Sequence, residues 1–342
     1  VGYEGKPLDS RQTLYWKAMV WDEAGEASPW SETGRWTMGL LEPSDWTARW
    51  IGNREDAYPD STLTTPAPYF RKTFRINKPV KQAKAYICGL GFYEMYLNGE
   101  RVGDQVLAPA VTNFDRRSLK KMLYFFDDQS NQRVLYNTFD VTSLVQKAEN
   151  TVGVLLGNGW YNQRDRTVEG CMWYDTPRLL CQLEIEYTDG STELVVTDDS
   201  WKTTTGPLLH DAIFTGEEYD ARLELDGWNR NGYKDSSWKK ALLVRAPKGS
   251  LHAQLAPHEK IAWTLQPVSC EQKDDSTYWY AFPEMISGWA HIKVQGNAGD
   301  RIKLRFVGEE KNDFGQVDLY TLRGSGCLLY TSPSPRDSTS SR

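Results

Sequence analysis

Short runs of alternating apolar and polar residues fill most of this 342-residue chain. Residues 179–188 place Leu, Cys, Leu, Ile and Tyr at every second position, with mostly polar residues between them. Residues 14–21 alternate too, with aromatics on both faces, and residues 301–306 alternate Arg or Lys with Ile, Leu and Phe. A period of two is typical of a strand with one buried face, so each run predicts a β-strand.

Turn signals separate the runs. An Asn-Gly pair at residues 98–99 and an Asp-Gly pair at residues 189–190 each stand between two such runs. Both pairs tolerate the positive φ that type I′ turns need, so they predict two hairpins. A longer turn at residues 296–300 joins predicted strands at residues 291–295 and 301–307.

Helical patterns are few and short, around residues 116–122 and 143–148. Short strands with frequent turns predict an all-β chain of tandem β-sandwich domains. At roughly 100–200 residues per domain, a chain of this length holds two or three of them.

Changes along the pattern divide the chain into three segments and a tail. Residues 1–43 predict a partial β module, and residues 44–248 predict the main sandwich, which is jelly-roll-like. Residues 249–324 predict the start of a second sandwich. Residues 325–342 are rich in Ser, Pro and Arg, so we expect a disordered, non-native tail that stays outside the fold.

Composition narrows the function classes. The net charge of -6 argues against a general nucleic-acid binder, and the basic run at residues 116–121 fits a solvated face. Four scattered His and five widely spaced Cys predict neither a zinc site nor a disulfide framework. No run of about 18 apolar residues predicts a membrane span. No signal peptide is visible at the N-terminus, which leaves the compartment open.

Catalytic motifs are missing from the sequence. It has no G-x-S-x-G, H-E-x-x-H, G-x-x-x-x-G-K-[ST] or G-x-G-x-x-G. Carboxylates are plentiful, and a glycosidase needs only two at the right separation. Glu184 and Glu186 fall on the polar face of a predicted strand, however, and Asp198 and Asp199 lie beside a predicted turn. We therefore assign no catalytic pair.

Four groups of motifs, in order along about 210 residues, carry a family resemblance. Residues 15–39 (YW, VWD, SPWS, WTMG) resemble the end of a fibronectin-type module, and residues 45–52 (DWTARWIG) the start of the next domain. Further motifs occur in residues 89–117 (GLGFYE, LNG, TNFDRR), 139–161 (FDVT, LGNGWY) and 216–228 (GEEYDAR, GW). Together they resemble the N-terminal, non-catalytic region of bacterial α-L-rhamnosidases of glycoside hydrolase family 78.

Residues 287–306 (SGW, VQG, GD, LRF) resemble the β-domain that precedes the family's catalytic barrel. The family's Asp-x-Gly-Gln-Asn run is replaced here by residues 282–286 (FPEMI), which puts any role of that run in doubt. The resemblance covers about residues 10–324. It implies a downstream (α/α)₆ barrel with acidic residues for inverting hydrolysis of α-L-rhamnosides, and a periplasmic or extracellular parent.

The resemblance also implies that the segment 44–248 binds L-rhamnose through a calcium ion, as it does in some members. Calcium takes six to eight oxygen ligands, and Asn113, Asp115 and Asn158 are the candidate ligands. The same three residues, with Trp160 and Tyr161 as stacking rings, are the candidate sugar contacts. The structural alternative is that Asn and Gly serve a tight loop and Trp160 fills the core.

Three functional hypotheses stay open at this point. The first is an accessory region of a rhamnosidase, with rhamnose-containing glycans and the downstream catalytic domain as partners. The second is a free-standing carbohydrate-binding protein, and the third is a structural spacer. Neither of the last two would have enzymatic activity.

Overall fold

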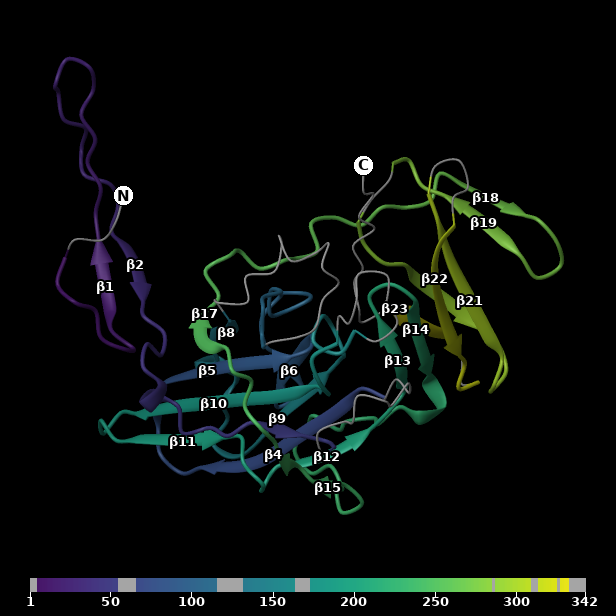
Figure 1. The fold of residues 1–342 in the computed structure, drawn as a ribbon, viewed down its shortest axis with the longest axis horizontal. Coiled ribbons are helices and arrows are strands. Elements are labelled where there is room, and N and C mark those ends of the chain that lie inside the picture. The colour runs from purple at the N-terminus through teal and green to yellow at the C-terminus, as the bar shows by residue number, and fades with distance from the viewer. Residues whose placement is uncertain are drawn as a thin grey trace.

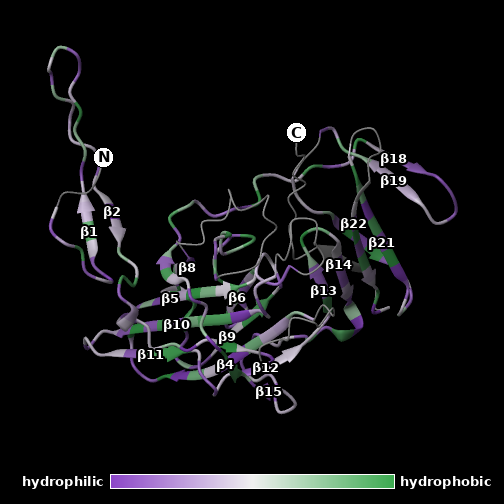
Figure 2. Cartoon of the chain, viewed as in Figure 1, coloured by the Kyte–Doolittle hydropathy of each residue, from purple (hydrophilic) through white to green (hydrophobic). Residues whose placement is uncertain are grey.

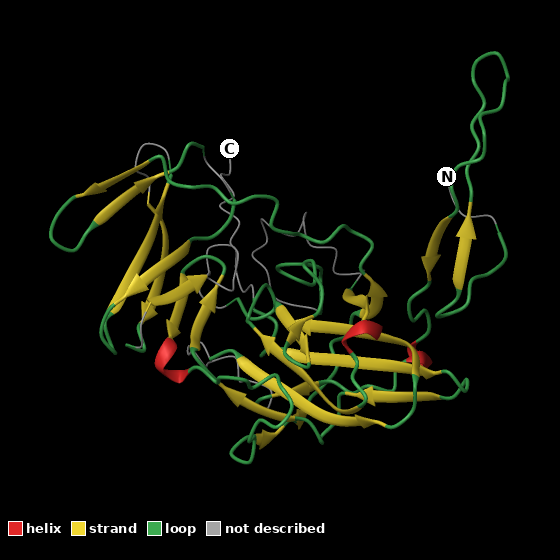
Figure 3. Cartoon of the chain, turned by 180° about the vertical axis from the view of Figure 1, so that it is seen from behind, coloured by secondary structure: helices red, strands yellow, loops and turns green. Residues whose placement is uncertain are grey.

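The computed structural model describes residues 5–54, 66–115, 132–163, 173–284, 287–308, 313–324 and 327–331. Strands dominate this part of the chain, and its helices are three short 3₁₀ turns, η1 (Pro43–Asp45), η3 (Thr142–Leu144) and η4 (Ala221–Leu223) (Figures 1 and 3). The all-β prediction is confirmed. No helix among these residues has the length and apolarity to cross a bilayer. Residues 116–122 and most of the predicted tail lie outside the described residues. The described part of that tail, residues 327–331, forms the strand β23, so the prediction that it stays outside the fold is wrong for these residues.

A small two-stranded sheet forms the N-terminal arm of the molecule (Figure 1). It pairs β1 (Thr13–Trp16) with β2 (Gly34–Thr37) in antiparallel register. The predicted strand over residues 14–21 ends at Trp16. Beyond it, the Ala18 N–H donates to the side-chain hydroxyl of Ser31 at 2.9 Å, so a side chain replaces a strand carbonyl there.

Two sheets form the main sandwich (Figure 1). The first runs in the order β16-β3-β10-β5-β8-β17, with β11 paired to β10: β3 (Ile51–Gly52), β5 (Val80–Leu90), β8 (Arg133–Asp140), β10 (Arg178–Tyr187), β11 (Thr192–Val196), β16 (Leu242–Leu243) and β17 (Ser250–Ala253). The second runs in the order β15-β12-β4-β9-β6-β7: β4 (Pro68–Ile76), β6 (Tyr93–Leu97), β7 (Glu100–Arg101), β9 (Ala148–Leu156), β12 (Lys202–Thr205) and β15 (Lys239–Lys240).

Apolar side chains from both sheets fill the space between them, among them Phe70, Ile87, Met95, Val154 and Leu183. A second cluster lies on the opposite face of the first sheet and includes Tyr86, Cys88 and Leu180, with Trp46 packed against it. The central strands β5 and β10 are therefore buried on both faces, and hydrophobic residues concentrate there (Figure 2). The prediction of one buried face for residues 179–188 is wrong for this reason.

The two predicted hairpins are present, but their turns differ. Asn98 (φ +56°) and Gly99 (φ +87°) both adopt positive φ between β6 and β7, as a type I′ turn requires. Between β10 and β11 only Gly190 has positive φ (+82°), and its N–H donates to the Tyr187 carbonyl at 3.0 Å. The type I′ prediction is wrong there, because the connection is a longer loop with one left-handed glycine.

The C-terminal part consists of a four-stranded sheet and two strand pairs (Figure 1). The sheet has the order β13-β14-β22-β21: β13 (Leu208–Ala212), β14 (Gly216–Asp220), β21 (Arg301–Val307) and β22 (Asp313–Thr321). The pairs are β18 (Ser269–Gln272) with β19 (Tyr278–Ala281), and β20 (His291–Gln295) with β23 (Cys327–Thr331). The strands predicted at residues 291–295 and 301–307 exist, but they pair with β23 and β22 and not with each other.

Strand pairing crosses the predicted domain boundary near residue 248. β17 starts beyond it, at Ser250, and pairs in parallel with β8 of the sandwich. β14 lies before it and pairs in parallel with β22 of the C-terminal sheet. The predicted helical stretch at residues 143–148 is only the single turn η3, because β9 already begins at Ala148.

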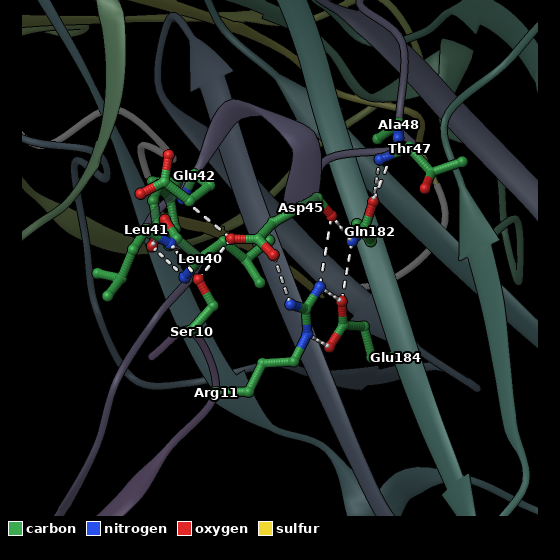
Figure 4. Close-up of polar contacts among 11 residues, drawn as sticks. Ser10, Arg11, Leu40, Leu41, Glu42, Asp45, Thr47, Ala48, Gln182 and Glu184 are labelled. Carbon is green, nitrogen blue, oxygen red and sulfur yellow. Dashed lines mark hydrogen bonds and ion pairs between the residues drawn. The ribbon is translucent and has the colours of Figure 1, made fainter. Parts of the chain in front are cut away.

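Arg11 joins the arm to the sandwich (Figure 4). Its guanidinium Nε and Nη2 donate to the two carboxylate oxygens of Glu184 on β10, at 2.7 and 2.6 Å. Its Nη1 donates to Oδ1 of Asp45 in η1 at 2.7 Å. A planar fork matched to one carboxylate and bonded to a second fixes direction as well as distance. We call these three residues the N-terminal joint.

Asp45 also receives hydrogen bonds from the Ser10 hydroxyl and from the Glu42 N–H (Figure 4). Burial alone would raise the pKa of this carboxyl. The hydrogen bonds from Ser10, from the Glu42 backbone and from Arg11 outweigh burial and hold the pKa below its ordinary value. Asp45 is therefore a charged group at the N-terminal joint at neutral pH.

The chain enters the sandwich beside Tyr136 of β8. The buried Tyr136 hydroxyl accepts from the Leu40 N–H at 2.7 Å and donates to the Leu40 carbonyl at 2.9 Å. A Cβ on Gly39 would overlap this hydroxyl. The connection from arm to sandwich is thus a bonded contact, in which only glycine fits beside the tyrosine.

Candidate sugar-binding site at the end of the sandwich

The loop after β9 carries three of the five candidate site residues. The Gly157 N–H donates to the Phe92 carbonyl at 2.7 Å, which brings the loop against the segment after β5. Gly91 (φ +117°) and Gly159 (φ +48°) lie where a Cβ would overlap the facing backbone. In this structure these glycines serve backbone-to-backbone packing, as the structural alternative predicts.

Asn158 is 2% exposed and binds Asp211 of β13 at several points. Its backbone N–H donates to Asp211 Oδ2 at 2.7 Å, and its side-chain Nδ2 donates to Asp211 Oδ1 and to the Asp211 carbonyl. Its Oδ1 accepts from Asn162 Nδ2 at 2.6 Å. These contacts engage both side-chain donors and the side-chain oxygen of Asn158, and they place it as a residue that holds the loop.

Tyr161 lies in the core at 1% exposure. Its ring stacks on Tyr174 with the centroids 5.6 Å apart and makes a T-shaped contact with Phe114 at the same centroid distance, 5.6 Å. Burial raises the pKa of its hydroxyl. A ring enclosed in this way offers no face to a sugar, so in this structure Tyr161 acts as packing.

Trp160 is half-buried and packs against the cluster that contains Phe114 and Tyr161. Its ring also makes an edge contact with Phe214, in the turn of the β13–β14 hairpin, at 5.7 Å. An anchored aromatic with part of its surface accessible is the arrangement that sugar platforms use. Among the three loop candidates, Trp160 alone keeps accessible surface.

Asn113 and Asp115 flank the buried ring of Phe114, which puts them at the same end of the sandwich. The Asn113 carbonyl accepts from the Arg133 N–H at 2.9 Å. The Asp115 carboxylate lies 3.9 Å from the Arg245 guanidinium. The ring contact of Phe114 with Tyr161 therefore brings the segment of Asn113 and Asp115 next to the loop that carries the other three candidates.

Two of the three candidate calcium ligands have side-chain oxygens that face protein groups in this structure. The side-chain oxygen of Asn158 is turned to Asn162, and the carboxylate of Asp115 faces a guanidinium. No group of three or more His, Cys, Asp or Glu side chains in the described residues is placed to hold a metal. Calcium requires several converging oxygens, and calcium binding stays a prediction.

Sequence reasoning missed Asp211, Asp175 and Arg178. Arg178 is fully buried; its Nη2 pairs with Asp175, and its Nη1 donates to the carbonyl of Arg245. A charged residue inside an apolar strand is the available signal, because such a residue is rarely buried without a partner. Asp175 lies only three residues before Arg178, whereas Asp211 binds Asn158 across 53 residues, and no local pattern identifies that distant partner.

Two family models match the chain. The model of the α-L-rhamnosidase N-terminal domain matches residues 78–125 and 126–262, which is more than half of the chain. The chain belongs to the α-L-rhamnosidase N-terminal domain family. The model of the Rha78A-like N-terminal immunoglobulin domain matches residues 1–42. Immunoglobulin domains share the sandwich architecture of fibronectin-type modules, which is the kind of module predicted for this segment. The predicted resemblance is confirmed.

Relatives of this family match most of the chain. An α-L-rhamnosidase of Formosa agariphila is 34% identical over 326 residues, covering 89% of this chain and 33% of the relative. One of an Alteromonas species is 33% identical, covering 92% and 33%. The structure of an α-L-rhamnosidase from Dictyoglumus thermophilum matches with a TM-score of 0.83 and 35% identity, covering 98% of this chain and 38% of that one. The chain spans about a third of the length of its curated relatives.

Proposed function

We propose that this chain is the accessory region of an α-L-rhamnosidase that hydrolyses terminal α-L-rhamnosides. The supporting observation is the match to the Dictyoglumus α-L-rhamnosidase over 98% of this chain but 38% of that one. The downstream catalytic domain of the parent is then the partner that performs hydrolysis. In this proposal the residues of this chain bind and orient the rhamnoside, and they carry no acid–base pair.

Hydrolysis of a nitrophenyl α-L-rhamnoside tests this division of labour. The full-length parent should release nitrophenol, and this chain alone should not. Release by the chain alone would contradict the assignment of the chemistry to the remainder of the parent. A full-length parent that is inactive on rhamnosides but active on another nitrophenyl glycoside would contradict the substrate.

We further propose that the end of the sandwich contacts a rhamnosyl unit of a glycan or glycoside. Trp160 supplies the stacking surface, and Asn113 and Asp115 supply polar atoms beside it. The supporting observation is that the Trp160 ring packs against Phe214 while keeping accessible surface. Asn158 and Tyr161 support this site from within and do not touch the sugar.

Titration calorimetry with L-rhamnose tests the contact. Binding in the millimolar range should be lost in Trp160→Ala and kept in Trp30→Ala, an exposed Trp of the arm that serves as the matched control. Repeating the titration with a chelator tests calcium, because only a calcium-dependent site would lose its heat. No heat for the unaltered chain in either case would leave the spacer role in place of the sugar contact.

A further inference from the structure

The hairpin β13–β14 belongs to two parts of the molecule. Its residues lie in the stretch of sequence that otherwise builds the sandwich, yet β14 pairs in parallel with β22 from Gly216↔Val317 to Asp220↔Thr321. The paired residues are 101 positions apart, as in Glu217 and Asp318. β22 pairs in turn with β21, so one sheet contains strands from both sides of the predicted boundary.

Side chains reinforce this backbone pairing. The Tyr219 and Tyr320 rings stack with centroids 5.6 Å apart and an interplanar angle of 18°. Ala221, Tyr320 and Leu322 are buried together in a core that Ile302 also contacts. Because residues of the hairpin and of the C-terminal strands share this core, neither set can bury its apolar surface in this way alone.

Gly216 allows the strands to approach. It has φ +120°, a conformation that residues with a Cβ rarely adopt. A Cβ at this position would also overlap the carbonyl of Val317, its partner on β22. The Val317 N–H donates to the Thr215 carbonyl at 3.0 Å, which continues the pairing into the hairpin turn.

The other strand of the hairpin is bound to the sandwich. The Leu208 carbonyl of β13 accepts from the Ala67 N–H at 3.0 Å, next to the start of β4. Asp211 accepts from the backbone and side chain of Asn158. In the hairpin turn, Phe214 makes a T-shaped ring contact with Trp160. The hairpin therefore touches the C-terminal sheet with one strand and the candidate sugar-binding loop with the other strand and its turn.

We propose that this hairpin is a mechanical coupler: docking of β22 on β14 holds β13 and its turn in place, and these hold the loop at residues 157–163 and the ring of Trp160. Loss of the β14–β22 pairing then loosens the loop. The proposal rests on the proposed function only where it names the loop as a sugar contact. The coupling concerns the protein alone and is measured without sugar.

Hydrogen exchange, followed by mass spectrometry in peptides from β14, β22 and the loop, tests the coupling in the whole chain. Gly216→Ala should speed exchange in all three regions by at least about tenfold, since exchange reports local opening. Gly190→Ala is the matched control, because Gly190 also has positive φ but no atom lies within 4 Å of an added Cβ. Faster exchange in β14 and β22 with an unchanged loop would overturn the proposal.

Asp211→Asn tests the same link from its other end, and it carries the test if Gly216→Ala does not fold. Asn158 donates to both carboxylate oxygens of Asp211, and an amide keeps only one side-chain oxygen as an acceptor, so one of these two hydrogen bonds is lost. Loop exchange should rise by at least about tenfold while β22 stays protected. A loop that exchanges as in the unaltered chain would overturn the coupler. Absence of rhamnose binding would instead remove the proposed sugar role and leave the exchange result standing.

Discussion

The N-terminal arm and the C-terminal sheet are attached to the sandwich in different ways. At the N-terminal joint, the side chains of Arg11, Asp45 and Glu184 hold the arm against the sandwich. At the C-terminal sheet, backbone groups of β14 and β22 pair directly, with a shared core beneath them. Ion pairs respond to protonation and salt, whereas the backbone hydrogen bonds between paired strands involve no titratable group. The arm is therefore attached by contacts that solution conditions can weaken, and the C-terminal sheet by part of the fold itself.

Among the variants that test this comparison, Gly216→Ala should lose the most free energy of unfolding. The substitution combines an unfavourable φ with a clash against the Val317 carbonyl, so we expect a loss of roughly 2–4 kcal/mol in the free energy of unfolding. Denaturant unfolding monitored by circular dichroism measures it. Gly190→Ala, with the same sign of φ and open space, should lose only about 1 kcal/mol. Equal losses in the two variants would mean that close strand approach is not what Gly216 provides.

Arg11→Met should have the next largest effect. It removes a fork bonded to two partly buried carboxylates, and we expect a loss of about 1–2 kcal/mol in denaturant unfolding. Arg301→Met is the control in the C-terminal sheet, because Arg301 makes one exposed ion pair with Glu218 at 3.3 Å. That variant should lose less than about 0.5 kcal/mol. A larger loss for Arg301→Met than for Arg11→Met would reverse the comparison.

Acid should weaken the N-terminal joint through Asp45. The folded-state pKa of Asp45 lies below its unfolded value of about 3.9, so its contribution is fully present above about pH 4. It is lost as the pH falls through the folded pKa. The stability difference between the unaltered chain and Arg11→Met should therefore hold between pH 5 and 7 and shrink from about pH 4 downward. A difference that stays constant down to pH 2 would exclude Asp45 as the responsive group.

Loosening the arm should have the smallest effect on the sandwich core, which cysteine alkylation can monitor. Burial raises the pKa of the Cys88 and Cys181 thiols, whereas Cys270 is exposed. Mass spectrometry after brief alkylation at neutral pH should find Cys270 modified and the two buried thiols intact. Arg11→Met should leave this pattern unchanged, because it alters an attachment and not the core. Modification of Cys88 in that variant would mean that loosening the arm also opens the sandwich.

Local patterns identified the strands well and their partners less well. The Asn98–Gly99 turn was predictable because its two residues encode the positive φ that the hairpin needs. The pairing of β14 with β22 was not, since it joins distant segments and depends on Gly216, one glycine among 27. Double-sided burial of β10 was also missed, because it depends on the distant segment at residues 45–48, whose backbone bonds the side chain of Gln182 on the outer face.

The candidate site, too, was predictable only in part. The sequence singled out the loop after β9, since glycines, an asparagine and two aromatics concentrate there, and its sugar-binding role stays a prediction. It could not separate Tyr161, enclosed by Tyr174, from Trp160, which keeps accessible surface. That distinction depends on which neighbours fold over each ring. Asp211, which holds Asn158, lies 53 residues away in the chain.

The contact of Tyr136 with Leu40 has a consequence for protein engineering. The N–H and the carbonyl of Leu40 are both bonded to the Tyr136 hydroxyl, and a side chain on Gly39 would overlap that hydroxyl. The connection at residues 39–40 is therefore held in one position. Grafting a different front module onto this scaffold therefore requires that residues 39–40 be kept together with Tyr136. A flexible Gly-Ser spacer spliced in at this crossing would produce a chimera whose front module swings freely.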